Sequence, residues 1–161
     1  TRGYQSNGFN QTIMFIASAE YEDKLSQIQN ELAESRVVFT EIDHNYVNPI
    51  SAKYLEKINQ VFSNRNLWTQ PIITNSYESP YKIFNEYMTF AVYSLYINDN
   101  YSKQDLEEYL PLLNETMTVR RGFTKFSEFN KALLTQYQKN TDISIFTLYE
   151  FILDWCAEQD K

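Results

Sequence analysis

The segment FTEIDHNYVNP, residues 39–49, places the single histidine of the chain three residues after a glutamate and four after a threonine. If this segment is helical, Thr40 and His44 lie on one face and Glu41 lies on the adjacent flank, so all three can reach one point. In an H-E-x-x-H pattern, the two imidazoles hold zinc and the carboxylate activates the metal-bound water. Here Thr40 stands where the first imidazole would be.

Two further groups could take part in such a site. Glu86 lies within the apolar segment IFNEYMTFAVY, where a carboxylate needs a partner, and His44 is the natural candidate. That pairing would survive the loss of a metal. Arg120 and Arg121, in TVRRGF, could hold a peptide carboxylate or polarise a carbonyl, although two arginines before a glycine also suit a helix C-terminus.

The chain has only 3 Gly and 4 Pro, which predicts a mainly α (α+β) fold. The short apolar run QTIMFIAS, residues 11–18, follows the turn-prone SNGFN and predicts one strand. Apolar periodicity and capping residues predict helices at 20–33, 35–47, 50–63, 80–97, 102–117, 124–139 and 144–158. Residues 64–79 lack helical periodicity and are a candidate loop over the site.

The predicted helices determine where the candidate site residues lie. A residue before proline disfavours α geometry, so the helix that carries His44 should stop near Val47. We expect Thr40, Glu41 and His44 to face a cleft, and Glu86 to approach His44 from the following long helix.

Composition limits the partners. A formal charge of −7 and a pI near 4.7 argue against nucleic acid and anionic membranes, and favour a neutral or cationic partner. The sequence has no run of 18 apolar residues, so it predicts no transmembrane segment. Aromatic residues make up 16% of the chain, so we expect a core of rings and some tyrosines along a groove. The single cysteine, Cys156, excludes an internal disulfide and is expected to be a buried, inert thiol.

FTEIDHNYVNP resembles the H-E-F-x-H-x-F-V-N-P signature of a family of bacterial zincin-like metallopeptidase domains, related in plan to glutamate-liganded zincins such as thermolysin. NEYMTFAVYSLY resembles the second motif of that family, N-E followed by an apolar helix. The resemblance extends over most of the chain. It implies one zincin-like domain over residues 1–161, with a helical core and a short N-terminal strand. Because the first residue is Thr1 and not Met, we also expect the native N-terminus to precede this sequence. The resemblance also implies His44 and Glu86 as zinc ligands, Glu41 as the general base, and an exported or cell-envelope bacterial protein.

Thr40 departs from that signature. A neutral hydroxyl binds zinc far more weakly than an imidazole, so His44 and Glu86 provide two good ligands where catalytic zinc usually has three. Glu41 could become a ligand, but it would then no longer be free to act as the base. We therefore expect zinc to be absent or weakly bound, and the chain to be a non-catalytic domain that binds a peptide or a protein in a groove beside residues 11–18.

Two alternatives remain at this point. One is an active zinc metallopeptidase, in which another ligand compensates for Thr40 or in which Thr40 replaced a native histidine. The other is an all-helical interaction module without zincin ancestry, which predicts that His44 and Glu86 lie far apart.

Overall fold

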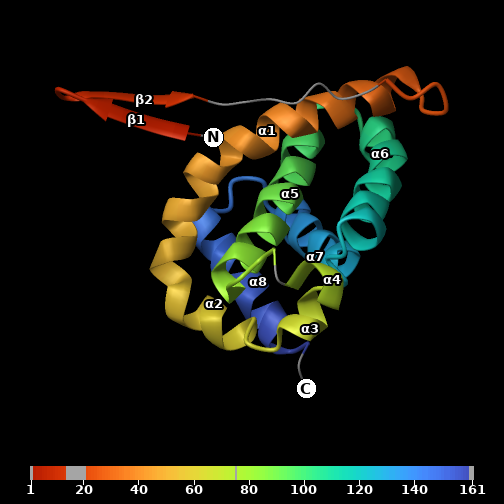
Figure 1. The fold of residues 1–161 in the computed structure, drawn as a ribbon. Coiled ribbons are helices and arrows are strands. Elements are labelled where there is room, and N and C mark those ends of the chain that lie inside the picture. Colours follow the sequence, from red (N-terminus) through yellow and green to blue (C-terminus); the bar gives the residue numbers. More distant parts are fainter. Residues whose placement is uncertain (1, 14–20, 75, 160–161) are drawn as a thin grey trace.

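The computed structural model describes residues 2–13, 21–74 and 76–159 (Figure 1). The fold is mainly helical, as the sequence predicts. Its elements in chain order are β1 (Arg2–Ser6), β2 (Phe9–Ile13), α1 (Gln27–Ser51), a 3₁₀ turn (Ala52–Tyr54), α2 (Leu55–Val61), α3 (Arg65–Trp68), α4 (Pro71–Thr74), α5 (Pro80–Asn100), α6 (Lys103–Glu115), a π-helical turn (Thr116–Arg120), α7 (Phe126–Lys139) and α8 (Ile145–Ala157). Within the described ranges, no helix combines the length and apolarity needed to cross a membrane.

The strand prediction was wrong in its bounds. The strand begins at Phe9, inside the predicted turn, and pairs antiparallel with β1 in a hairpin whose register joins Arg2 to Ile13. Asn7 and Gly8 both have positive φ, 49° and 80°, which a two-residue type I′ turn requires. The Asn-Gly pair therefore marks the tip of a hairpin, not the start of a lone strand. Residues 14–18 of the predicted strand lie outside the described residues.

The first two predicted helices are a single helix, α1. Ser26 accepts a hydrogen bond from the Gln29 N–H, and the Gln29 side chain accepts one from the Ser26 N–H, which is a complete capping box. No glycine or proline interrupts the chain between Gln27 and Asn48, so the helix propagates without a break. The expected boundary after residue 33 does not exist.

Helix α1 also does not stop at Val47, because its C-terminal turn is held from outside. A proline inside a helix removes one backbone hydrogen bond and costs about 3 kcal/mol. Here the Tyr81 hydroxyl donates to the Asn48 carbonyl at 2.7 Å, and the Tyr149 hydroxyl donates to the Val47 carbonyl at 3.2 Å. These two tertiary hydrogen bonds do not replace the missing bond to the Asn45 carbonyl, but they hold the last turn in place, and the helix passes through Pro49 to Ser51.

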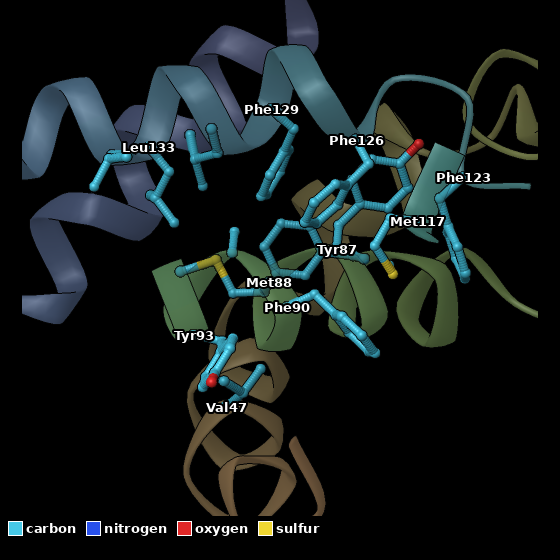
Figure 2. Close-up of a cluster of buried hydrophobic side chains, with 14 of the residues drawn as sticks. Val47, Tyr87, Met88, Phe90, Tyr93, Met117, Phe123, Phe126, Phe129 and Leu133 are labelled. Carbon is cyan, nitrogen blue, oxygen red and sulfur yellow. The ribbon is translucent and has the colours of Figure 1, made fainter. Parts of the chain in front are cut away.

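Helix α5 lies at the centre of the fold and packs against α1, α2, α6 and α7 (Figure 1). Its inward residues meet rings from the rest of the chain, as the aromatic composition predicted. Figure 2 shows Tyr87 among Phe123, Phe126 and Phe129, with edge-to-face ring contacts at 5.2–5.4 Å to Phe123 and Phe129. The Tyr87 hydroxyl donates to the Trp68 carbonyl at 2.6 Å, so this buried polar atom has a partner. Cys156 is a fully buried thiol, and burial raises its pKa.

Residues 64–79 are not a structureless loop, because they form the short helices α3 and α4. This segment is joined to the turn after the π-helix by two backbone hydrogen bonds: Gln70 N–H to Gly122 O at 2.8 Å, and Thr124 N–H to Trp68 O at 3.0 Å. Gly122 has φ +74°, a conformation that glycine adopts without strain. The reversal at Gly122 fixes the backbone beside Arg121.

Candidate functional site

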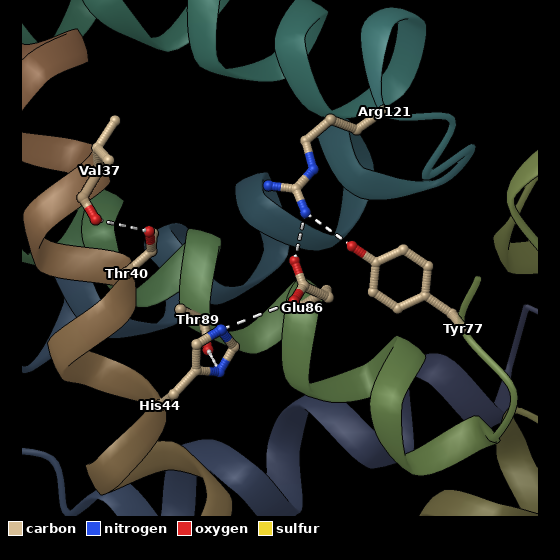
Figure 3. Close-up of polar contacts among 7 residues, drawn as sticks. All are labelled: Val37, Thr40, His44, Tyr77, Glu86, Thr89 and Arg121. Carbon is tan, nitrogen blue, oxygen red and sulfur yellow. Dashed lines mark hydrogen bonds and ion pairs between the residues drawn. The ribbon is translucent and has the colours of Figure 1, made fainter. Parts of the chain in front are cut away.

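Glu86 is the centre of a polar cluster that joins α1, α5, the segment before α5 and the turn after the π-helix (Figure 3). Its Oε2 accepts a hydrogen bond from the Arg121 guanidinium at 2.7 Å, and its Oε1 lies 3.6 Å from His44 Nε2. The side chain is only 14% exposed, so the carboxylate depends on these neighbours for its charge compensation. The predicted approach of Glu86 to His44 is observed, contrary to the expectation of the all-helical alternative.

Arg121 is fixed by three kinds of contact. The same nitrogen that donates to Glu86 also donates to the Tyr77 hydroxyl at 2.8 Å. The guanidinium carbon lies 4.5 Å from the centre of the Phe90 ring, which is cation–π geometry. Since Gly122 anchors the backbone at the next residue, Arg121 is a preorganised cation.

Tyr77 supports Arg121 as a neutral hydrogen-bond acceptor. Burial, and after it the negative charge of Glu86, raise the pKa of the Tyr77 hydroxyl. The hydroxyl therefore stays protonated near neutral pH. Neither this tyrosine nor its link to Arg121 was predicted, because Tyr77 lies in a segment without helical periodicity.

His44 is the partner of Glu86 on α1, and its side chain is 30% exposed. Its Nε2 faces Glu86 at a distance longer than a direct hydrogen bond, and its Nδ1 lies 3.5 Å from Thr89 Oγ1, at the outer limit of hydrogen bonding. Both ring nitrogens thus have a polar neighbour but neither has a short contact. The imidazole is held loosely in comparison with Arg121.

The prediction that Thr40, Glu41 and His44 all face a cleft is wrong in part. Thr40 is only 8% exposed, and its hydroxyl donates to the Val37 carbonyl at 3.4 Å in its own helix. It lies on the side of α1 that faces the core, because the buried stripe of this helix also includes Asp43 and Val47. Glu41 is half-buried. Of the three signature positions, only His44 borders the pocket described next.

A polar pocket of about 370 Å³ opens beside Glu86. It is lined by His44, Asn48, Ser76, Tyr77, Ser79, Tyr81, Lys82, Asn85 and Glu86. The pocket thus lies between the C-terminal half of α1, residues 76–79 and the first turns of α5. The groove that we expected beside residues 11–18 remains a prediction, since most of that segment lies outside the described residues. The expected tyrosines at a groove are present as Tyr77 and Tyr81.

Asn85, which lines the pocket, is only 5% exposed, and no hydrogen-bond partner is found for its Oδ1 within the described part of the chain. The same holds for Asn48 Oδ1. Two amides with unpaired oxygens at one pocket are unusual, because buried polar atoms normally have partners. Both unpaired oxygens belong to residues that line the pocket, although the oxygen atoms themselves are buried.

Asp43 is a second buried carboxyl that the sequence reading missed. Burial raises the pKa of Asp43 to about 7, and its Oδ2 has no hydrogen-bond partner among the described residues. The signal in the sequence was its place on α1: Asp43 lies one helical turn before Val47, on the buried face.

The residues present do not fit the zinc that the family resemblance implies. Among the described residues, no group of three or more His, Cys, Asp and Glu side chains is placed to hold a metal ion. The donors near Glu86 are one imidazole and one carboxylate, and the Thr40 hydroxyl points to the backbone of its own helix. The other oxygen of Glu86 is bound to a guanidinium.

Arg120 and Arg121 have different roles, although they are adjacent. Arg120 is exposed and lies 3.5 Å from Glu115 and 3.8 Å from Glu22, ion pairs of a solvated helix end. Arg121 turns inward to Glu86. Of the two arginines considered for ligand binding, only Arg121 belongs to the cluster.

Comparison of the chain with protein-family models, with curated proteins and with solved structures finds no match. The zincin resemblance stays a hypothesis that rests on the signature residues. The function is accordingly argued from the geometry of the Glu86 cluster and its pocket.

Proposed function

We propose that this chain is a non-catalytic domain that binds a segment of a peptide or protein in the pocket beside Glu86, on a zincin-like scaffold whose metal site is degenerate. The proposal rests on the two neighbours of Glu86, His44 and Arg121. Glu86 lies next to His44, as the glutamate ligand of a glutamate-type zincin would, but its charge is compensated by Arg121. The site is thus organised without the third donor that catalysis requires.

The form of the pocket supports a peptide ligand. A volume of about 370 Å³ is at the small end for ligand sites, and suits one or two side chains better than a large cofactor. Its lining offers hydroxyls, amides and two tyrosine rings, groups that suit both the backbone and the side chains of a peptide.

Binding is tested with a pool of fluorescent pentapeptides and a variant that fills the pocket. Ser76 is exposed at the pocket edge, so Ser76→Trp should block entry without changing the core. Ser63→Trp is the matched control, because Ser63 is also exposed but does not line the pocket. Peptides retained by the parent and by Ser63→Trp, but not by Ser76→Trp, are the expected result. Equal retention by both variants, or by none of the three proteins, would contradict the proposal.

Catalysis is tested separately. The parent protein is incubated with the same pool and added zinc, with Glu41→Gln as the control for contaminating proteases. We expect no cleavage, because without a bound metal Glu41 faces a water of pKa about 15.7. Cleavage by the parent that disappears in Glu41→Gln would instead favour the alternative of an active metallopeptidase with a compensated ligand set.

A further inference from the structure

We propose that the Arg121 guanidinium is the cation around which this site is built, and that it closes the site to zinc independently of Thr40. Two residues, not one, would then separate this chain from a metal-binding version of the same geometry. The inference rests on the contacts of Glu86 and does not depend on whether the pocket binds a peptide.

The first step concerns charge. Glu86 is mostly buried, and the Arg121 nitrogen at 2.7 Å provides the positive charge that such a carboxylate needs. A metal ion bound to the remaining oxygen, Oε1, would lie within about 6 Å of that guanidinium, a range in which like charges disfavour each other strongly. Zinc and Arg121 are therefore competitors for one carboxylate.

The second step concerns persistence. A lysine or histidine could lose its proton to admit a metal, but an arginine stays charged at any pH at which a protein is folded. Arg121 also has little freedom to swing away. It stacks on Phe90, donates to Tyr77, and precedes Gly122, whose carbonyl is bound to the Gln70 N–H. The repulsion is thus a fixed property of the site.

The third step concerns Thr40. Thr40 precedes His44 by one helical turn, so Thr40→His adds an imidazole that can share a metal with His44. That change provides the missing donor but leaves the guanidinium in place. Restoring a three-ligand site should therefore require the removal of the Arg121 charge as well.

The test compares four proteins: the parent, Thr40→His, Arg121→Gln, and the double variant Thr40→His with Arg121→Gln. Each is titrated with zinc in a calorimeter and with cobalt(II) in a visible spectrophotometer, which reports tetrahedral ligation directly. We expect only the double variant to bind one equivalent, about 10- to 100-fold more tightly than Thr40→His, the range for changes to neighbours of a metal site. Comparable tight binding by Thr40→His alone overturns the proposal, and so does a folded double variant that binds no metal.

Two controls identify the cause. Thr40→His with Arg121→Lys is titrated at pH 6, where the lysine ammonium holds its proton, and should bind as weakly as Thr40→His at the same pH. Binding equal to that of the glutamine double variant at this pH would show that charge is not the cause. Adding Glu86→Gln to the double variant should abolish metal binding, and retained binding would place the metal elsewhere.

A second measurement covers the case in which the glutamine variant does not fold. Thr40→His with Arg121→Ala is titrated with zinc in the presence of methylguanidinium or of its neutral analogue methylurea. Methylguanidinium should weaken zinc binding more than methylurea, because only the cation reproduces the charge of Arg121. Equal effects of the two additives contradict the proposal.

Discussion

Asp43 is a side chain for which the structure predicts a large effect of pH on stability between about pH 4 and pH 7. Its carboxyl is buried on the inner face of α1, and its Oδ2 lacks a hydrogen-bond partner among the described residues. Burial disfavours the charged form and raises the pKa of Asp43 from 3.8 to about 7. The substitution Asp43→Asn keeps the shape of the protonated acid and removes the charge.

The direction of the pH effect on stability follows from the difference in bound protons between the folded and unfolded states. Between about pH 4 and pH 7, folded Asp43 holds a proton that the unfolded chain has released, so the folded state loses stability as the pH rises through this window. The difference between 3.8 and about 7, at roughly 1.4 kcal/mol per pH unit, sets an upper limit of about 4 kcal/mol. Local relaxation and water entry reduce this limit, and we expect about 2–4 kcal/mol at pH 8.

Urea unfolding of the parent and of Asp43→Asn at pH 5, 6, 7 and 8 measures the effect. The gain in the free energy of unfolding from the substitution should be about a third of its full value at pH 5, rise through pH 6 and reach its full value at pH 8. Asp142→Asn, at an exposed aspartate, is the matched control, and its free energy of unfolding should differ from that of the parent by the same amount at every pH. A difference between parent and Asp43→Asn that is constant from pH 5 to pH 8 would refute the assignment of a buried, protonated acid.

Three further predictions concern the site and its supports. Glu86→Gln leaves Arg121 without its counter-charge in a half-buried position, so urea unfolding should show a loss of about 1–3 kcal/mol in the free energy of unfolding. The double variant with Arg121→Gln should lose less than the sum of the two single variants, and strict additivity would contradict a coupled pair. Gly122→Ala puts a Cβ at φ +74°, 3.3 Å from neighbouring side-chain atoms, and should cost about 1–2 kcal/mol in the same assay, whereas parental stability would show that the turn relaxes freely. Tyr81→Phe removes the hydroxyl that donates to the Asn48 carbonyl and should cost about 1 kcal/mol by thermal unfolding, with an unchanged midpoint as the contrary result.

Local patterns in the sequence determined the helical class and the places of the later helices. The small number of glycines and prolines, and the caps at Ser79, Ser102 and Ser144, act within a few residues and need no tertiary information. The apolar neighbours of Glu86, together with the resemblance to a zincin signature, likewise predicted that His44 and Glu86 would approach each other. The capping box of Ser26 and Gln29 is also a local signal, and it marks the start of α1, but the helix prediction did not take it into account.

Only the tertiary structure decided the course of α1 through Pro49 and the partner of Glu86. The helix continues because hydroxyls of Tyr81 and Tyr149, from helices far along the chain, reach its last carbonyls. Arg121 meets Glu86 because a turn at Gly122 is held against residues 68–70. Such contacts depend on where separate elements pack, and neither periodicity nor residue spacing contains that information. The sequence alone therefore determined which side chains could do chemistry, and packing decided that the central carboxylate binds an arginine.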